Sequence, residues 1–219
     1  MKRETIIDKL ASHTECFKSI LSSKIYIRDY KHYDLVLARN NDNRGVVIDD
    51  NPDPDWASVV LDNAMPDSLV VDADCFPENA LPEEKAGIHA SQCECVLFPA
   101  DGNDSDWVLF VETKYTESAE IAKDEKVKYP QKMYCQIKST LSYFRQRDII
   151  DKEQRVYAIM SYPKLLEPFD SWNFPLKEMD EETGEEKELS VLDILQRHKI
   201  HLRPTNHARI ISPKRIKLG

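Results

Sequence analysis

The chain has 219 residues, 41% of them hydrophobic and 32% charged, with a formal net charge of -9. This size and composition favour one domain with a sizeable core and a highly charged surface, and no apolar run is long enough to span a bilayer. The cysteines follow no disulfide spacing and the N-terminus lacks the apolar stretch of a signal peptide, so we expect reduced thiols in a cytoplasmic protein.

The negative total conceals a basic C-terminal segment. From Arg197 onward the sequence contains seven Lys or Arg and no acidic residue. An acidic chain argues against non-specific binding to nucleic acid, whereas this segment favours it; the competing interpretation is a solubilising tail. We expect residues 199–219 to be extended, with one domain over residues 1–211 and a disordered basic tail at residues 212–219.

The N-terminal part is expected to begin with one amphipathic helix. Apolar residues recur at helical spacing from Ile6 to Leu21, which predicts a helix over residues 3–22. Short or alternating apolar runs then predict strands at residues 24–30, 33–38 and 45–48. Loops are predicted at residues 49–56 and 76–87, and the pattern does not distinguish helix from strand at the apolar segments 59–61 and 69–71.

Two apolar runs in the middle of the chain predict a buried β-hairpin. Cys95–Phe98 and Trp107–Val111 flank the turn-forming segment Pro99–Asp106, and neither run alternates, as expected of strands covered on both faces. Folding the hairpin symmetrically about its tip brings every apolar residue of the first run opposite an apolar partner. The pairs are Cys95 with Val111, Val96 with Phe110, Leu97 with Leu109 and Phe98 with Val108.

The same register places Glu94 directly opposite Glu112, at the end of the hairpin. Opposed residues share a face, and Lys114 lies two residues beyond Glu112, so its side chain is expected on that face too. Two opposed carboxylates repel each other unless one is protonated or a cation lies between them. A bulge in either strand would shift this pairing by one residue.

After the hairpin, the sequence predicts a helix and then a strand. Residues 116–128 show no clear period, and Pro130 then suits the first turn of a helix with one apolar face. This helix is expected to end at about Arg147, and it is followed by a strand at residues 156–162, an exposed acidic hairpin or loop at residues 177–188 and a short helix at residues 189–198.

This order of elements, with Glu94 on one strand and Glu112-Thr113-Lys114 on the next, resembles the PD-(D/E)XK, or restriction-endonuclease-like, nuclease superfamily. The resemblance covers roughly residues 84–162, the expected core. It implies an α/β fold with a mixed central β-sheet flanked by helices in α-β-β-β-α-β order, to which this chain adds an N-terminal helix and strands. The sequence departs from the family in two ways: Glu94 stands where aspartate is commoner, and no proline precedes it.

The resemblance implies a metal-dependent nuclease that hydrolyses phosphodiester bonds, with DNA as the expected substrate, in a repair, mobile-element or defence setting. The expected catalytic residues are Glu94, Glu112 and Lys114. The two carboxylates and the Thr113 carbonyl would bind Mg²⁺ or Mn²⁺, because Mg²⁺ prefers oxygen ligands and retains several waters. The Lys114 ammonium would orient the attacking water and stabilise the developing charge.

The sequence does not choose among the candidates for further residues of the family's site. Some family members use a polar residue on the helix after the hairpin, for which Gln131, Gln136 and Lys138 are candidates. An acidic residue before the hairpin, Glu83 or Glu84, is a further candidate. For all five, the alternative is an ordinary exposed position.

Two alternatives to this interpretation are retained. Cys93 and Cys95, together with His89, have the ligand types of a zinc site, but a C-x-C string without a second pair favours packing inside a strand. The same fold could also serve without catalysis, as a binding or inhibitor module whose acidic surface contacts a basic protein. The expected partners are therefore nucleic acid, a second protein or a second copy of this chain, and no membrane.

Overall fold

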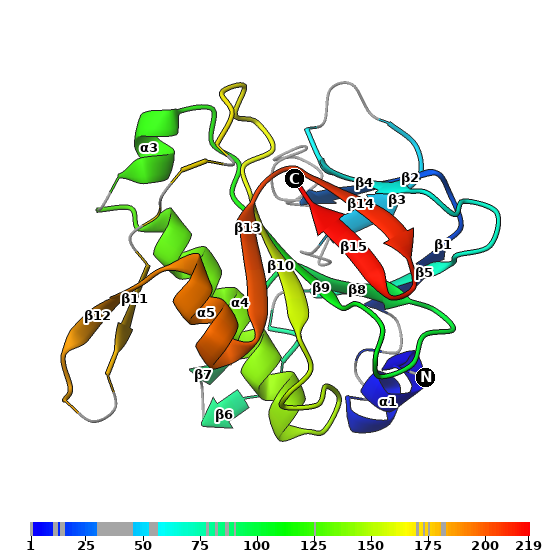
Figure 1. The fold of residues 1–219 in the computed structure, drawn as a ribbon, viewed down its shortest axis with the longest axis horizontal. Coiled ribbons are helices and arrows are strands. Elements are labelled where there is room, and N and C mark those ends of the chain that lie inside the picture. Colours follow the sequence, from blue (N-terminus) through cyan, green and yellow to red (C-terminus); the bar gives the residue numbers. More distant parts are fainter. Residues whose placement is uncertain are drawn as a thin grey trace.

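The computed structural model describes residues 2–10, 13, 16–29, 46–52, 57–77, 79–81, 83–85, 88–89, 91–124, 126–169, 171–172, 174, 176–180 and 183–219. Within these residues the protein is a mixed α/β structure in which two large sheets pack face to face (Figure 1). Helices cover the outer face of one sheet, and the second sheet covers its other face. The strand expected at residues 33–38 lies outside the described residues.

The central sheet has six strands in the order β1-β5-β8-β9-β10-β13. The first four are antiparallel neighbours, whereas β9, β10 and β13 run parallel. The carboxyl ends of the three parallel strands therefore lie at one edge of the sheet. The strands span Phe17–Ile20, Val71–Cys75, Cys95–Pro99, Leu109–Thr113, Val156–Ser161 and Ile200–Pro204 in that order.

Two helices connect the parallel strands and cover one face of the central sheet. α4 (Tyr129–Gln146) connects β9 to β10, with Pro130 in its first turn, and buries Met133, Ile137 and Phe144 against the strands. α5 (Val191–His198) precedes β13 and begins with a capping box formed by Ser190 and Asp193. The short helix α3 (Ala119–Lys123) precedes α4 in the same crossover, whereas α1 (Lys2–Lys9) lies before the first strand of the sheet.

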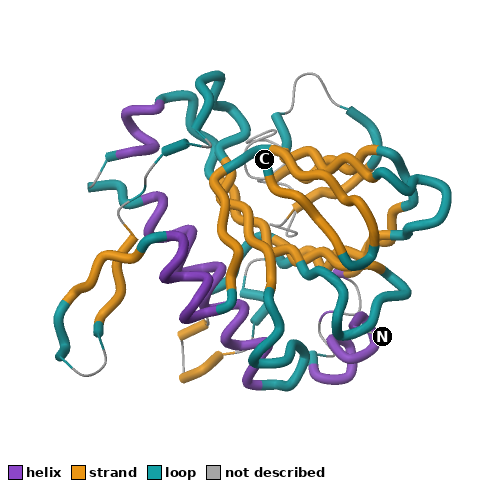
Figure 2. Tube along the Cα trace, in the orientation of Figure 1, coloured by secondary structure: helices purple, strands orange, loops and turns teal. Residues whose placement is uncertain are grey.

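The other face of the central sheet packs against a five-stranded sheet of order β15-β14-β4-β2-β3. Its inward side chains, such as Ile25, Leu61 and Ile210, form one apolar cluster with Leu97 and Leu109 of the central sheet. Figure 2 shows the resulting segregation, with α4 and α5 on one side of the central sheet and the five-stranded sheet on the other. The five strands span Arg215–Leu218, His207–Ser212, Val59–Asn63, Lys24–Asp29 and Val46–Asp49.

Two small hairpins complete the described elements. One pairs β6 (Glu83–Lys85) with β7 (Ile88–His89), and the other pairs β11 (Leu176–Met179) with β12 (Glu186–Leu189). The second hairpin is the exposed acidic hairpin that the sequence predicts at residues 177–188. No helix in the described part of the chain is both long enough and apolar enough to cross a membrane.

The structure differs from the sequence predictions at both ends of the chain. The helix predicted over residues 3–22 is wrong at Phe17–Ile20, because these residues form β1 and pair with β5, so pairing between distant strands overrides the helical spacing of the apolar residues. At the other end, β15 (4 residues) lies within residues 212–219, the segment that was expected to be a disordered tail, and Ser212 belongs to β14. Ile216 and Leu218 alternate with exposed basic residues and pack into the core between the sheets.

The expected hairpin and the elements after it are confirmed. β8 and β9 pair Cys95 with Val111, Val96 with Phe110 and Leu97 with Leu109, which is the register predicted from the apolar runs. All residues of both strands are buried, consistent with the absence of alternation. The segments at 59–61 and 69–71 contribute to β4 and β5, and α3 falls within the stretch where no period was visible.

Candidate functional site

The Glu112-Thr113-Lys114 string lies at the carboxyl end of β9, in the middle of the central sheet. β8 flanks this strand on one side and β10 on the other, which explains why Glu112 and Thr113 are buried although both are polar. The Lys114 amide donates a hydrogen bond to the Ser161 carbonyl over 2.9 Å, so the sheet pairing with β10 continues one residue past the strand. The backbone of the string is therefore held by hydrogen bonding on the β10 side.

Glu112 and Lys114 form an ion pair at this edge. The Lys114 Nζ contacts Glu112 Oε1; the Glu112 side chain is 0% exposed and that of Lys114 is 24% exposed. Burial alone would lower the pKa of Lys114, but the charge and hydrogen bond of Glu112 outweigh it and raise this pKa above its usual value. Lys114 thus stays an ammonium at neutral pH and projects partly into solvent.

Glu94 lies at the start of β8, next to this pair, but not directly opposite Glu112. Its amide donates to the Val111 carbonyl over 3.0 Å, although Val111 is already the partner of Cys95. Two residues facing one is the count of a β-bulge. The predicted opposition of Glu94 and Glu112 is therefore displaced by one residue. Glu94 still acts on the same ammonium, because its charge contributes to the raised pKa of Lys114.

The bulge also separates the two cysteines of the C-x-C string. Cys93 packs in the cluster on the helix side, whereas Cys95 packs in the cluster between the two sheets. Residues two apart in a regular strand share a face, so the extra residue at Glu94 places these thiols on opposite faces. Burial raises the pKa of the Cys93 thiol well above its usual value, and the nearby charge of Glu112 adds to the effect. Both thiols are core residues rather than zinc ligands.

A third carboxylate, that of Asp29, reaches this edge from the second sheet. Asp29 ends β2 and is 3% exposed, and its charge also contributes to the raised pKa of Lys114. Tyr115 connects the two sheets here: its hydroxyl accepts a hydrogen bond from the Asp29 amide (3.1 Å) and donates one to the Ala57 carbonyl (3.0 Å). Sequence reasoning missed Asp29. The available signal was an acidic residue at the end of an apolar strand, the position that also singled out Glu112.

The neighbouring strand ends supply neutral polar groups. Asn206, in the turn between β13 and β14, accepts hydrogen bonds from the Ser161 hydroxyl (2.5 Å) and the Tyr162 amide (3.1 Å). Its own amide group donates to the Tyr162 carbonyl over 3.0 Å. The Thr113 hydroxyl is buried and has no hydrogen-bond partner among the described residues. The edge is thus held rigidly around Glu112 by β10 and by the turn that starts β14.

The structure distinguishes the candidates on the helix after the hairpin. Gln136 donates to the Gln92 carbonyl over 2.8 Å, which places it beside the start of β8. Gln131 instead bonds the backbone of Lys177 in β11, and Lys138 pairs with Glu178 of the same strand. Gln136 is therefore the one of the three that approaches Glu94. The side chains of Glu83, Glu84 and His89 lie outside the described residues.

The carboxylate oxygens at this edge are ligands of the type that a hard cation prefers. Carboxylate oxygens are the ligands that Mg²⁺ prefers, and the charges of Glu112, Glu94 and Asp29 all contribute to the raised pKa of Lys114. In the described part of the chain, no three His, Cys, Asp or Glu side chains gather closely enough to form a complete metal cluster. Mg²⁺ needs no such cluster, because it is commonly held by one or two carboxylates and water.

Comparisons with protein-family models, with curated proteins and with solved structures gave no match to this chain.

Proposed function

We propose that the protein is a metal-dependent nuclease that hydrolyses phosphodiester bonds in nucleic acid, with DNA as the substrate. The observation that carries the proposal is the placement of Glu112-Thr113-Lys114 at the end of a buried central strand, with Glu94 at the adjacent end of the next strand. Both glutamates act on the Lys114 ammonium. An isolated E-x-K string would be weak support in a highly charged chain; its position is what gives it weight.

The order of the core elements supports the proposal. β5, β8 and β9 form an antiparallel meander, α4 crosses over, and β10 returns parallel to β9. This is the β-β-β-α-β part of the arrangement implied by the resemblance to PD-(D/E)XK nucleases. One departure is that a β-sheet covers the face opposite α4. Fold alone does not define function, so the site residues carry the argument.

Each residue has a distinct role under this proposal. Glu94 and Glu112 would hold Mg²⁺ or Mn²⁺ with the Thr113 carbonyl, and the bound ion would supply Lewis-acid polarisation of the phosphate and a more acidic water. Lys114 keeps its positive charge because of Glu112, so it is available to orient a water and to offset charge on the phosphate. Burial of Glu112 fixes the direction of its carboxylate in advance.

Cleavage assays test the proposal directly. Purified protein is incubated with plasmid, single-stranded DNA and RNA in Mg²⁺, Mn²⁺ or EDTA, and the products are separated on gels. We expect cleavage of DNA with either metal, none in EDTA and none by the Lys114→Met variant. A preparation whose activity persists at full level in Lys114→Met would contradict the proposal.

A second function is favoured by one specific observation. Glu112 is fully buried and its carboxylate contacts Lys114, an arrangement that also suits a purely structural ion pair. The fold would then act as a protein-binding or inhibitor module. That alternative predicts no cleavage of any nucleic acid in any metal by the folded wild-type protein.

A further inference from the structure

The outer face of the five-stranded sheet carries a set of basic side chains. β15 alternates throughout and β14 alternates over its first four residues, before a register shift at Ile210–Ser212. Ala208, Ile210, Ile216 and Leu218 face the core, and the residues between them in these stretches face outward. The last part of the basic segment is therefore folded into two adjacent strands of this sheet, so its charges lie on a fixed surface and not on a mobile tail. Arg197 and Arg203 belong instead to α5 and β13. The outward basic residues are His207, Arg209, Arg215 and Lys217, which are all exposed.

Strand register places these charges side by side. Arg209 pairs with Lys217 on one neighbouring strand and with Asp62 on the other. Asp62 in turn pairs with Lys24 of β2, so one row crosses four strands. Adjacent strands lie about 4.8 Å apart and side chains on one face repeat about every 7 Å along a strand, which gives a dense positive grid.

The acidic residue within the row does not neutralise the grid. Asp62 is engaged by His207 over 2.8 Å and by Lys24 over 3.9 Å. Arg209, Arg215 and Lys217 form no ion pair with any described residue. A surplus of positive charge is thus concentrated on one face of a chain whose net charge is -9. Such a face orients the molecule towards a polyanion, because the basic face attracts the polyanion and the acidic remainder of the protein surface repels it.

The face lacks the side chains that would favour a membrane surface. Peripheral membrane binding combines basic residues with large apolar residues that enter the lipid interface. In the described part of the chain, the large exposed apolar side chains are Leu21, Ile121, Leu166, Met179, Val191 and Leu192, and none belongs to this sheet. A flat basic face without apolar anchors instead matches a phosphate backbone, which presents closely spaced charges.

The basic face meets the candidate site at one edge. β14 begins at His207, directly after Asn206, and Asn206 accepts hydrogen bonds from Ser161 and Tyr162. The Ser161 carbonyl accepts the Lys114 amide hydrogen bond. The C-terminus also returns to this edge, since the Gly219 amide donates to the His207 carbonyl over 3.0 Å. Figure 1 shows the C-terminus beside the end of β13.

We propose that the outer face of β15, β14, β4 and β2 binds the phosphate backbone of duplex DNA and delivers it to the edge that holds Glu112 and Lys114. The choice of DNA as the partner rests on the proposed function. The charge grid itself rests on register and burial alone. Arg209 and Lys217 are the central contacts, and neither contributes to the core or to the E-x-K edge.

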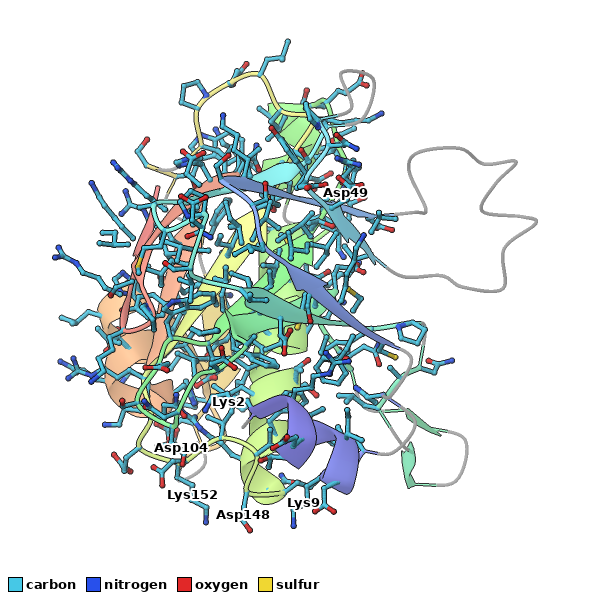
Figure 3. All side chains as sticks on the ribbon, turned by 90° about the vertical axis from the view of Figure 1, so that its right-hand side faces the viewer. Lys2, Lys9, Asp49, Asp104, Asp148 and Lys152 are labelled. Atoms are coloured by element: carbon cyan, nitrogen blue, oxygen red, sulfur yellow. The ribbon has the colours of Figure 1, made fainter. Side chains whose placement is uncertain are left out.

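Binding is measured by fluorescence anisotropy with a short labelled duplex in EDTA, so that cleavage does not interfere. The test variant is Arg209→Gln/Lys217→Gln. The matched control is Lys126→Gln/Lys187→Gln, which removes the same charge from exposed positions. Figure 1 shows β12, which carries Lys187, on the opposite side of the molecule from the five-stranded sheet, and Figure 3 shows Asp49 of β3, in that sheet, far from Lys9 of α1. Melting temperatures of all variants confirm that they remain folded.

We expect the wild type to bind the duplex with strong salt dependence. The test variant should bind roughly tenfold more weakly, and the slope of log affinity against log salt should become about 2 units shallower, because two phosphate contacts are lost. The control should bind as the wild type does. Equal binding by test variant and wild type, equal losses in test and control, or binding to anionic lipid vesicles without binding to DNA would each overturn the inference.

The result of this DNA-binding test can be distinguished from the result of the cleavage assay that tests the proposed nuclease. Salt-dependent duplex binding that needs Arg209 and Lys217, in a protein that never cleaves, would retain this face and reject the enzyme. Cleavage that continues in a test variant with unchanged affinity would retain the enzyme and reject this face.

Discussion

Lys114 is the residue on which both functional interpretations of the site depend. Its ammonium contacts a carboxylate that is 0% exposed, so removing the ammonium leaves the Glu112 charge in the interior without this partner. Breaking a buried pair from one side is costly, whereas replacing both partners costs less. We expect Lys114→Met to lower the free energy of unfolding by about 3 kcal/mol, and Glu112→Gln/Lys114→Met to lower it by less than the sum of the single changes.

Urea denaturation of the two single variants and the double variant measures this coupling. Lys126→Met serves as a control, because Lys126 is exposed and forms no ion pair among the described residues. Additive losses within about 0.4 kcal/mol would mean that Glu112 and Lys114 do not interact in solution.

At the scale of elements, Glu178 holds the β11–β12 hairpin against the helices. Its carboxylate accepts hydrogen bonds from Tyr134 (2.6 Å), Lys138 (2.5 Å) and His198 (2.9 Å). Burial alone would raise the pKa of Glu178, but these contacts lower it to about 2 from 4.5. A lowered folded-state pKa stabilises the protein above pH 4.5, and this contribution is lost as the pH falls towards 2.

We therefore expect Glu178→Gln to reduce the urea midpoint at neutral pH, and we expect this deficit to disappear as the pH falls to 2 and below, where the wild-type carboxylate itself becomes protonated. Glu188→Gln, a substitution at an exposed position in β12, should leave the midpoint unchanged at every pH. A Glu178→Gln deficit of the same size across the whole pH range would show that charge is not the origin of the contribution.

An element could be predicted where a local sequence pattern determines it, and it could not be predicted where contacts between distant segments determine it. The β8–β9 register was predictable because every apolar residue had one matching apolar partner. The bulge at Glu94 could not be predicted, because it depends on Cys93 packing in the apolar cluster on the helix side and Cys95 packing in the cluster between the two sheets. β1 was missed because its stability comes from pairing with β5. The position of Asp29 beside Lys114 required the second sheet, which no local pattern specifies.

At the scale of the whole molecule, β15 closes one edge of the second sheet. Ile216 is 4% exposed and Leu218 is 8% exposed, and both pack between the sheets. We expect deletion of residues 212–219 to lower the free energy of unfolding by roughly 4 kcal/mol, since burying such a side chain contributes about 1.5–3 kcal/mol. Arg215→Gln/Lys217→Gln removes charge alone and should leave the urea midpoint unchanged. A truncated protein as stable as the wild type would mean that β15 is not docked in solution.

The central claim is that Glu94 and Glu112 together bind one divalent cation beside Lys114. A ligand that binds only the folded state raises its stability by mass action.

The decisive measurement is the melting temperature of the wild type, Glu94→Gln, Glu112→Gln and the double variant, each in EDTA and in millimolar Mn²⁺, with Glu120→Gln as the exposed control. We predict that Mn²⁺ raises the melting temperature of the wild type and the control, and that either site substitution alone abolishes most of this shift, with no further loss in the double variant. A wild-type melting temperature that does not respond to Mn²⁺ or Mg²⁺, together with a lower one in Glu112→Gln, would contradict the claim.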